Sequence, residues 1–317
     1  MRLKTSLTAL LLIGPPALAA PFAYITNQGS HDVSVIDLAT RQVVATVPVG
    51  RSPAGVVAVS RVGKVFVSNP DSKTISVIDM RSQAVVDTLP AGDGPVGIDA
   101  SADGLSLFVS DWYRDRLMIF NTRRGAADRV EVAVGKAPAG VAVAGDGNTV
   151  FVAERDDDSI AIVDARAATV RARIRVGSHP FALLLDESRA RLYALNVLSD
   201  DVSVIDLRQR AVIATVKVGR APYGAALAHG NTLLYVTNQH GNTVSVIDAE
   251  TLQPLRTLEG FAYPEGIAAH GEQVYVVNWM NDCVSVLDAK SGRELDRINT
   301  GLNSRGFGAF IGTPTIP

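Results

Sequence analysis

Short runs of alternating apolar and polar residues return along the chain at a nearly constant interval. The segment YITNQGSHDVSVID (24–37) reappears as YVTNQHGNTVSVID (235–248) and YVVNWMNDCVSVLD (275–288). Seven copies end at Asp37, Asp79, Asn121, Asp164, Asp206, Asp248 and Asp288, and successive ends lie 42, 42, 43, 42, 42 and 40 residues apart. A fixed period of this length is the sequence signature of a repeat architecture.

Each repeat contains four short segments with the composition of β-strands. Along one period they are VVATVPVG (43–50), PAGVVAVS (53–60), KVFVSN (64–69) and ISVID (75–79), separated by Gly, Pro, Asn and Asp. No segment carries a helical apolar stripe. Four strands in about 42 residues are typical of a propeller blade. The sequence therefore predicts an all-β, seven-bladed propeller of four-stranded blades.

The register of the repeat predicts how the ring closes. The chain after residue 20 begins on PFAYITN, which corresponds to the second strand of a blade, so the inner strand of that blade must come from elsewhere. Ser304-Arg305-Gly306 stands where other repeats have Pro-x-Gly. We expect residues 306–312 to join residues 22–50, which would remove the free sheet edges.

The first twenty residues, MRLKTSLTALLLIGPPALAA, read as a secretory signal. They combine a positive start, a short apolar run and a small-residue site, so we expect cleavage near Ala19 or Ala20 and export to the periplasm or the medium. Residues 21–317 then form one propeller domain, expected to be monomeric, with no transmembrane segment. Cys283 is the only cysteine, so no disulfide can form within the chain.

Charge narrows the classes of function. The formal net charge is −2, and basic residues are scattered rather than clustered. Proteins that bind nucleic acid by its phosphates need a basic surface, so the composition does not favour nucleic acid as a partner.

The repeated units and linkers such as VGRSPAGVVAV resemble the YVTN β-propeller repeat family, which includes the YncE-like proteins. The resemblance covers roughly residues 22–312. It implies a secreted or periplasmic propeller; more distant relatives are the d1-haem propellers of nitrite reductases and seven-bladed lactonases. The third and fourth repeats depart from the pattern, with Asn121 replacing Asp and Glu154 replacing Asn.

Residues that differ between repeats, at loops on one face of the ring, are the best candidates for a binding site. These loops predict a ligand or partner site made of Trp112, Tyr113, Tyr223, His240, Tyr263, Glu265, Trp279 and Arg305. Glu265 and Arg305 lie on neighbouring inner strands, so a mutual ion pair is an alternative role for them.

Other chemistry is less well supported by residue spacing. His31, His240, Met280 and Cys283 offer soft ligands for copper, but a lone, half-exposed thiol is an alternative role for Cys283. Asp156-Asp157-Asp158 lacks the alternating spacing of a calcium loop, and a solvated acidic loop is the alternative. His179 could act as a base or bind haem, or could be a polar turn residue. No catalytic motif of the common hydrolase or phosphate-binding types is present.

The sequence favours a non-catalytic binding or protein-interaction scaffold that uses the loop face of the propeller. The expected partner is a small molecule, a peptide or a periplasmic protein, with no catalytic residues and no required cofactor. The alternative is a propeller that handles haem, copper or another metal, or a lactonase-like hydrolase. A haem protein would need a wide aromatic pocket with an axial histidine, and a hydrolase would need carboxylates around a metal.

Overall fold

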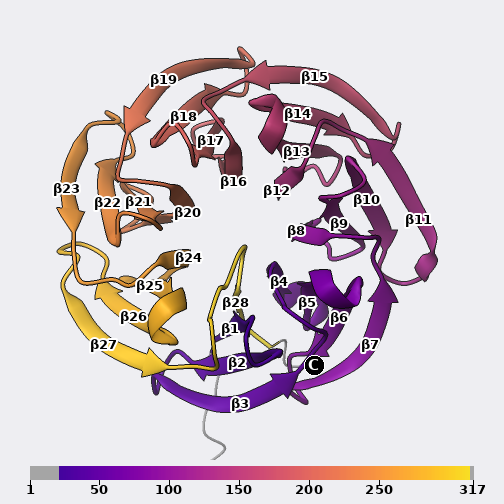
Figure 1. Ribbon diagram of the computed structural model, residues 1–317, viewed down its shortest axis with the longest axis horizontal. Coiled ribbons are helices and arrows are strands. Elements are labelled where there is room, and N and C mark those ends of the chain that lie inside the picture. The colour runs from indigo at the N-terminus through magenta and orange to yellow at the C-terminus, as the bar shows by residue number, and fades with distance from the viewer. Residues whose placement is uncertain (1–20, 315–317) are drawn as a thin grey trace, which may run out of the picture.

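The computed structural model describes residues 21–314, which form a ring of seven four-stranded antiparallel sheets (Figure 1). From the axis outward, blade 1 contains β28 (Ile311–Gly312), β1 (Phe22–Asn27), β2 (Asp32–Asp37) and β3 (Gln42–Pro48). Blade 2 contains β4 (Val56–Val59), β5 (Lys64–Asn69), β6 (Thr74–Asp79) and β7 (Ala84–Pro90). Blade 3 contains β8 (Pro95–Ala100), β9 (Ser106–Asp111), β10 (Arg116–Asn121) and β11 (Gly125–Ala133).

The remaining blades follow the same order from the axis outward. Blade 4 contains β12 (Pro138–Val143), β13 (Thr149–Glu154), β14 (Ser159–Asp164) and β15 (Thr169–Arg175). Blade 5 contains β16 (Pro180–Asp186), β17 (Arg191–Asn196), β18 (Asp201–Asp206) and β19 (Ala211–Lys217). Blade 6 contains β20 (Pro222–Ala228), β21 (Leu233–Asn238), β22 (Thr243–Asp248) and β23 (Pro254–Leu258). Blade 7 contains β24 (Pro264–His270), β25 (Gln273–Asn278), β26 (Cys283–Asp288) and β27 (Glu294–Asn299).

The only helices in the described range are four single 3-10 turns: η1 (Ser60–Val62), η2 (Pro70–Ser72), η3 (Arg155–Asp157) and η4 (Trp279–Asn281). No helix among residues 21–314 has the length and apolarity needed to cross a membrane. The predicted all-β, seven-bladed fold is confirmed.

The two middle strands of each blade are buried on both faces because each blade packs against a neighbour on either side. In β5, Val65, Phe66 and Val67 are all buried, although alternate residues point to opposite faces of the sheet. Outer strands are instead mostly exposed, with a single buried residue near the end, as in β3 and β19. The repeated apolar runs thus form the interfaces between blades.

The Asp that ends each VSVID segment closes the next turn. Asp37 Oδ1 accepts hydrogen bonds from the backbone N–H groups of Ala39 (2.8 Å) and Thr40 (2.9 Å), and Asp206 and Asp248 do the same in their blades. The Gly of Pro-x-Gly allows the inner strands to approach one another: a Cβ on Gly97 would lie 2.0 Å from the carbonyl oxygen of Ala139. Both repeated residues have the structural roles that turn and glycine chemistry predict.

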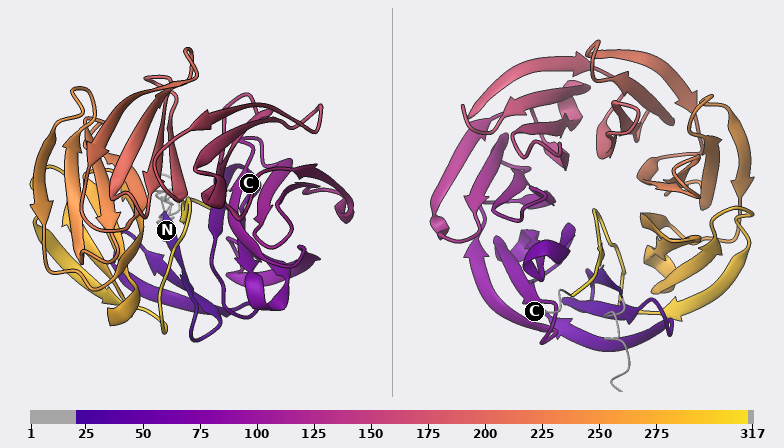
Figure 2. Two further views of the ribbon diagram at one scale, coloured as in Figure 1. Left: turned by 45° about the horizontal axis from the view of Figure 1, so that its top comes forward. Right: turned by 180° about the vertical axis from the view of Figure 1, so that it is seen from behind.

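The C-terminal segment closes the ring as predicted. Figures 1 and 2 show it in yellow, reaching toward the centre of the ring beside blade 1. Arg305 N donates to Thr26 O (2.7 Å) and Tyr24 N donates to Phe310 O (2.8 Å). Strand β28 pairs antiparallel with β1 through Phe22 and Gly312. The same segment also contacts blade 2, since Val56 N donates to the carbonyl oxygen of Phe307 (2.8 Å).

Blades 3 and 4 carry an acid where the other five blades carry Asn at the end of the second strand. In blade 2, Asn69 Nδ2 donates to Thr74 Oγ1 (3.2 Å) and Ser76 Oγ (3.0 Å). In blade 3 the equivalents of these acceptors are Arg116 and Met118, and Arg116 donates to the buried Asp111 through Nε (3.0 Å) and Nη2 (2.9 Å). An arginine therefore balances the charge that the acid introduces.

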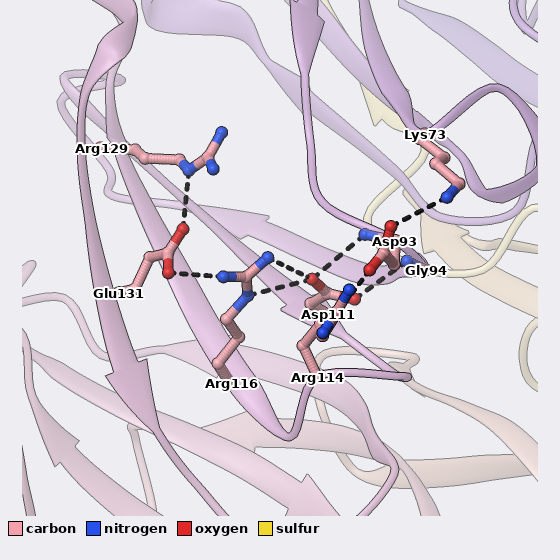
Figure 3. A network of polar contacts seen from close by, with 8 residues as sticks. All are labelled: Lys73, Asp93, Gly94, Asp111, Arg114, Arg116, Arg129 and Glu131. Carbon is pink, nitrogen blue, oxygen red and sulfur yellow. Dashed lines mark hydrogen bonds and ion pairs between the residues drawn. The ribbon is translucent and has the colours of Figure 1, made fainter.

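Figure 3 shows the network around Asp111. Asp111 also accepts a hydrogen bond from the backbone N–H of Gly94 (2.9 Å), and Arg116 reaches Glu131 as well (2.5 Å). In blade 4 the arginine comes from the outer strand β15, where Arg173 pairs with the buried Glu154 (3.0 Å). The acids that replace Asn in blades 3 and 4 are thus each paired with an arginine of the same blade.

Candidate functional site at the channel mouth

All inner strands begin on the same face of the ring, which we call the loop face. At the start of each inner strand, the residue after Pro (after Ser304 in the C-terminal segment) is Ala54, Val96, Ala139, Phe181, Tyr223, Glu265 or Arg305, in blade order from blade 2. The last four are large, and they come from consecutive inner strands around the ring. The loop-face mouth of the channel is therefore filled unevenly.

Three of these residues form a buried charged cluster. Arg305 donates to the Tyr223 hydroxyl through Nη2 (2.5 Å) and Nε (3.1 Å), and its Nε lies 2.8 Å from Glu265 Oε2. Gln239 Nε2 donates to the other carboxylate oxygen, Glu265 Oε1 (2.7 Å). The ion pair that was the alternative role for Glu265 and Arg305 is present. It holds both side chains in place.

Burial governs the electrostatics of this cluster. Glu265 is 2% exposed and Tyr223 is 4% exposed, and burial raises the pKa of both groups. Burial also opposes the charge of Arg305, but the neighbouring Glu265 carboxylate raises the pKa of the guanidinium overall. Because the Arg305 Nε–H is directed to Tyr223, Glu265 Oε2 accepts no aligned hydrogen bond from the described residues.

Four aromatic rings meet at the axis just inside the mouth, and we call them the aromatic plug: Trp112, Phe181, Tyr223 and Phe307. Phe181 lies 4.6 Å from Tyr223, 5.0 Å from Phe307 and 6.2 Å from Trp112, measured between ring centroids. Blades 3, 5 and 6 and the C-terminal segment supply these rings, so their contacts span the axis. The plug closes the channel at the loop face.

A second group of rings, the aromatic ladder, runs across the loops of blades 6 and 7 and consists of His240, Tyr263 and Trp279. Their ring centroids are 5.5 and 5.4 Å apart, and His240 Nε2 lies 3.1 Å from the Tyr263 hydroxyl. Trp279 Nε1 donates to Gln28 Oε1 of blade 1 (3.2 Å). Burial and the nearby Glu265 raise the pKa of Tyr263.

The backbone fixes the ladder in position. Tyr263 has a left-handed conformation (φ 55°), which is uncommon for an aromatic residue, and its N–H donates to Asn242 Oδ1 (2.8 Å). Trp279 begins η4, and its N–H donates to the carbonyl oxygen of Tyr263 (3.1 Å). Met280 follows in the same turn and is 59% exposed. The ladder is thus a preorganised surface with an exposed thioether beside it.

The structure places seven of the eight predicted binding residues in the charged cluster, the ladder or the plug. Tyr223, Glu265 and Arg305 form the charged cluster, and His240, Tyr263 and Trp279 form the ladder. Trp112 joins the plug and lies under the Arg155 guanidinium, 5.3 Å from ring centroid to Cζ. Tyr113 is 73% exposed on blade 3 and belongs to none of these three groups.

The four soft-metal candidates have different environments. Cys283 is 1% exposed rather than half-exposed as expected, burial raises the pKa of its thiol, and Asn278 Nδ2 lies 3.7 Å from its sulfur. His31 Nδ1 accepts a hydrogen bond from Ser52 N (3.1 Å), while Met280 and His240 are exposed. Among residues 21–314, no three His, Cys, Asp or Glu side chains are grouped so that they could hold a metal ion.

The acidic loop of blade 4 is held by backbone hydrogen bonds rather than standing free in solvent. Asp157 Oδ2 accepts from Lys136 N (2.8 Å) and Asp158 Oδ1 accepts from His179 N (2.9 Å). His179 lies 3.7 Å from Asp156 and 3.8 Å from Asp158, as a polar turn residue would.

Sequence reasoning did not select Gln239, Phe181 or Phe307 as site residues. Phe181 and Phe307 are bulky at positions where most repeats have smaller residues, which was the available signal. The sequence also gave no sign of a cavity of about 600 Å³ beyond the plug, lined by the inner strands of blades 3 to 7 and by Phe307.

The fold and the mouth define a seven-bladed propeller whose channel is closed on the loop face by aromatic rings. Residues 57–148 match the family model of YNCE-like β-propellers, and residues 144–266 match that of the cytochrome D1 heme domain. Together with the seven-bladed ring, the first match supports the similarity to YncE-like propellers that the repeat motif indicated. No curated protein sequence shows significant similarity to the chain.

Solved structures with this fold are distant in sequence. Hydrazine synthase of Kuenenia stuttgartiensis is 17% identical, with a TM-score of 0.74 over 90% of this chain and 100% of its own. A functionally unknown protein from Desulfotomaculum acetoxidans is 13% identical, with a TM-score of 0.77 over 93% and 99%. The dihydro-heme d1 dehydrogenase NirN, in complex with DHE, is 15% identical, with a TM-score of 0.68 over 90% and 74%. At these identities the likeness establishes the fold alone.

Proposed function

We propose that the protein is a non-catalytic binding scaffold that recognises a peptide or protein partner through the aromatic ladder on its loop face. The observation that carries the proposal is the ladder itself: three rings in contact from two blades, with the exposed Met280 beside them. Aromatic residues and methionine are enriched at protein interfaces, where rigid rings lose little conformational entropy on binding.

The charged cluster supports the ladder from below. Gln239 directly precedes His240, and Glu265 follows Tyr263 by two residues, so the cluster fixes the loops that carry two rungs of the ladder. A partner would meet a surface whose backbone is already ordered, which reduces the entropy lost on binding. Arg305, with 21% of its side chain exposed, lies at the edge of this surface and can orient a carboxylate or carbonyl of the partner.

The test compares the full-length wild type and two variants for retention of partners from the envelope fraction of the native host. Trp279→Ala should weaken retention at least tenfold, the effect expected when a central aromatic anchor is removed from an interface. Tyr113→Ala, which removes a more exposed ring from blade 3 on the same face, is the control and should behave like the wild type. Equal retention by Trp279→Ala and wild type, with thermal unfolding unchanged, would refute the placement of the site.

A tetrapyrrole-binding role is the second candidate, and the match of residues 144–266 to the cytochrome D1 heme domain favours it. The residues at the mouth do not form a haem pocket as placed. The plug fills the axis, His179 faces Asp156 and Asp158, and His240 is bonded to Tyr263. An absorption spectrum of protein purified from its native compartment separates the two candidates, because haem binding would give a Soret band.

Two further expectations belong to this proposal. The first expectation is export directed by residues 1–20, which lie outside the described residues. An exported scaffold would present the aromatic ladder to partners in the envelope. A lactonase-like hydrolase would need carboxylates converging on a metal at the mouth, whereas the one carboxylate of the charged cluster there, Glu265, is paired with Arg305. Metal analysis of the same purified protein tests that role.

A further inference from the structure

The channel behind the aromatic plug is a separate cavity that the proposed function does not use. Its volume is about 600 Å³, and its lining contains none of the residues of the ladder or of the charged cluster. The lining comes from the middle and far ends of the inner strands, together with Asn231 and Ser188, which follow those strands. The cavity therefore opens on the face opposite the loop face, and Phe307 forms its closed end.

The walls near the closed end are apolar. Val141, Leu183, Ala225 and Ile267 lie there, each the fourth residue of its inner strand, around Phe307. Toward the open end the lining becomes acidic, with Asp99, Asp186 and Glu187 and no Lys, Arg or His among the lining residues. Asp186 is neutralised by Arg189 (2.9 Å), which leaves Asp99 and Glu187 as the uncompensated charges.

These two carboxylates come from the blades on either side of blade 4, and both accept hydrogen bonds at the end of its inner strand, β12. Asp99, from blade 3, accepts a hydrogen bond from Val143 N (2.8 Å), and Glu187, from blade 5, accepts one from Gly145 N. Val143 ends β12 and Gly145 lies two residues further on in the following turn, so the two N–H donors are at most about 7 Å apart. Both bonds are to neutral backbone groups, and no cation within the described residues pairs with either acid.

We propose that this channel binds an amphiphilic amine, with its apolar chain toward Phe307 and its ammonium group between Asp99 and Glu187. An apolar chain replaces water along the closed end, which is favourable in proportion to the area covered. The ammonium group supplies the missing countercharge and donates to two carboxylates in a partly desolvated setting, where such bonds are strong. The charge pattern excludes fatty acids, whose carboxylate would meet two like charges.

The probes are decylammonium, decan-1-ol and decanoate, each used below its micelle concentration and titrated calorimetrically into the full chain. Decylammonium should bind with one site per chain, at least about tenfold more tightly than decan-1-ol, with decanoate showing no binding. The double variant Asp99→Asn/Glu187→Gln keeps a side-chain oxygen at each position to accept the Val143 and Gly145 N–H bonds, and it should lose that tenfold preference. Asp71→Asn, an exposed acid on the loop face, is the control and should leave it unchanged.

The opposite results overturn the proposal. Equal binding of decylammonium and decan-1-ol, several equivalents of decylammonium per chain, or an unchanged preference in the double variant would each do so. A failure of the ladder experiments would leave this test unaffected, because Trp279→Ala changes no residue that lines the channel.

Discussion

Replacing Arg116 by Thr gives blade 3 the residue that blade 2 carries as Thr74, and it should destabilise the fold markedly. Asp111 is 0% exposed and would lose both Arg116 contacts while keeping its backbone donors. Removing one partner of a buried ion pair costs about 3–5 kcal/mol of the free energy of unfolding. Because Asp111 keeps its backbone hydrogen bonds, we expect a loss at the lower end of this range, about 3 kcal/mol. Asp111→Asn alone should cost only about 1 kcal/mol, since Arg116 remains partly exposed and paired with Glu131.

The double variant Asp111→Asn/Arg116→Thr rebuilds the Asn–Thr pair of blade 2 and should cost about 1–2 kcal/mol, giving a coupling energy of about 2–3 kcal/mol. Urea unfolding measures each value, followed by the fluorescence of Trp112, next to Asp111 in the chain, and of Trp279 in blade 7. Arg124→Thr, which breaks an exposed pair with Asp128, is the matched control and should change stability by less than about 1 kcal/mol. A coupling energy below about 0.5 kcal/mol would refute the account of how blade 3 tolerates its acid.

Three further predictions concern closure, pH and the thiol. Ending the chain after Gly301 removes the segment that bonds to Thr26, so cooperative unfolding should be lost; a truncated chain that melts like the full one contradicts the closure. Burial raises the pKa of Asp99 to about 6 from 3.8. The free energy of unfolding should therefore fall by about 3 kcal/mol as pH rises from about 4 to above 6, and urea titrations should find no such fall in Asp99→Asn. Cys283, buried with its thiol pKa raised, should resist Ellman's reagent until the protein unfolds; rapid labelling of the native protein would contradict its burial.

The fold could be predicted from the sequence because every blade repeats the same local chemistry. The alternation of VSVID, the Asp that closes the next turn and the glycine near the axis each have a single structural role, and seven copies reinforce it. Even the closure followed, since Ser304-Arg305-Gly306 kept the register of Pro-x-Gly. The strand KVFVSN, expected at 64–69, is β5 with the same bounds.

The candidate site could be predicted only in part. The repeat register placed Tyr223, Glu265 and Arg305 at equivalent positions of neighbouring blades, and the ion pair between the last two was foreseeable from that. It did not show that Phe307 would cross the axis to reach Phe181, because the direction of a side chain depends on the space that other blades leave. The burial of Cys283 was missed for a similar reason: most of its counterparts in the repeat are polar.

The central claim is that partners bind on the aromatic ladder, and site-specific photo-crosslinking tests it most directly. A crosslinking residue is placed at position 280, beside Trp279, and at position 113 in a second variant, and both are irradiated in living cells of the native host. Met280 and Tyr113 are both exposed on the loop face, so either substitution leaves the core unchanged. We predict a discrete crosslinked partner at 280 that is lost when Trp279→Ala is added. The same adduct at 113, or its persistence without Trp279, would contradict the account.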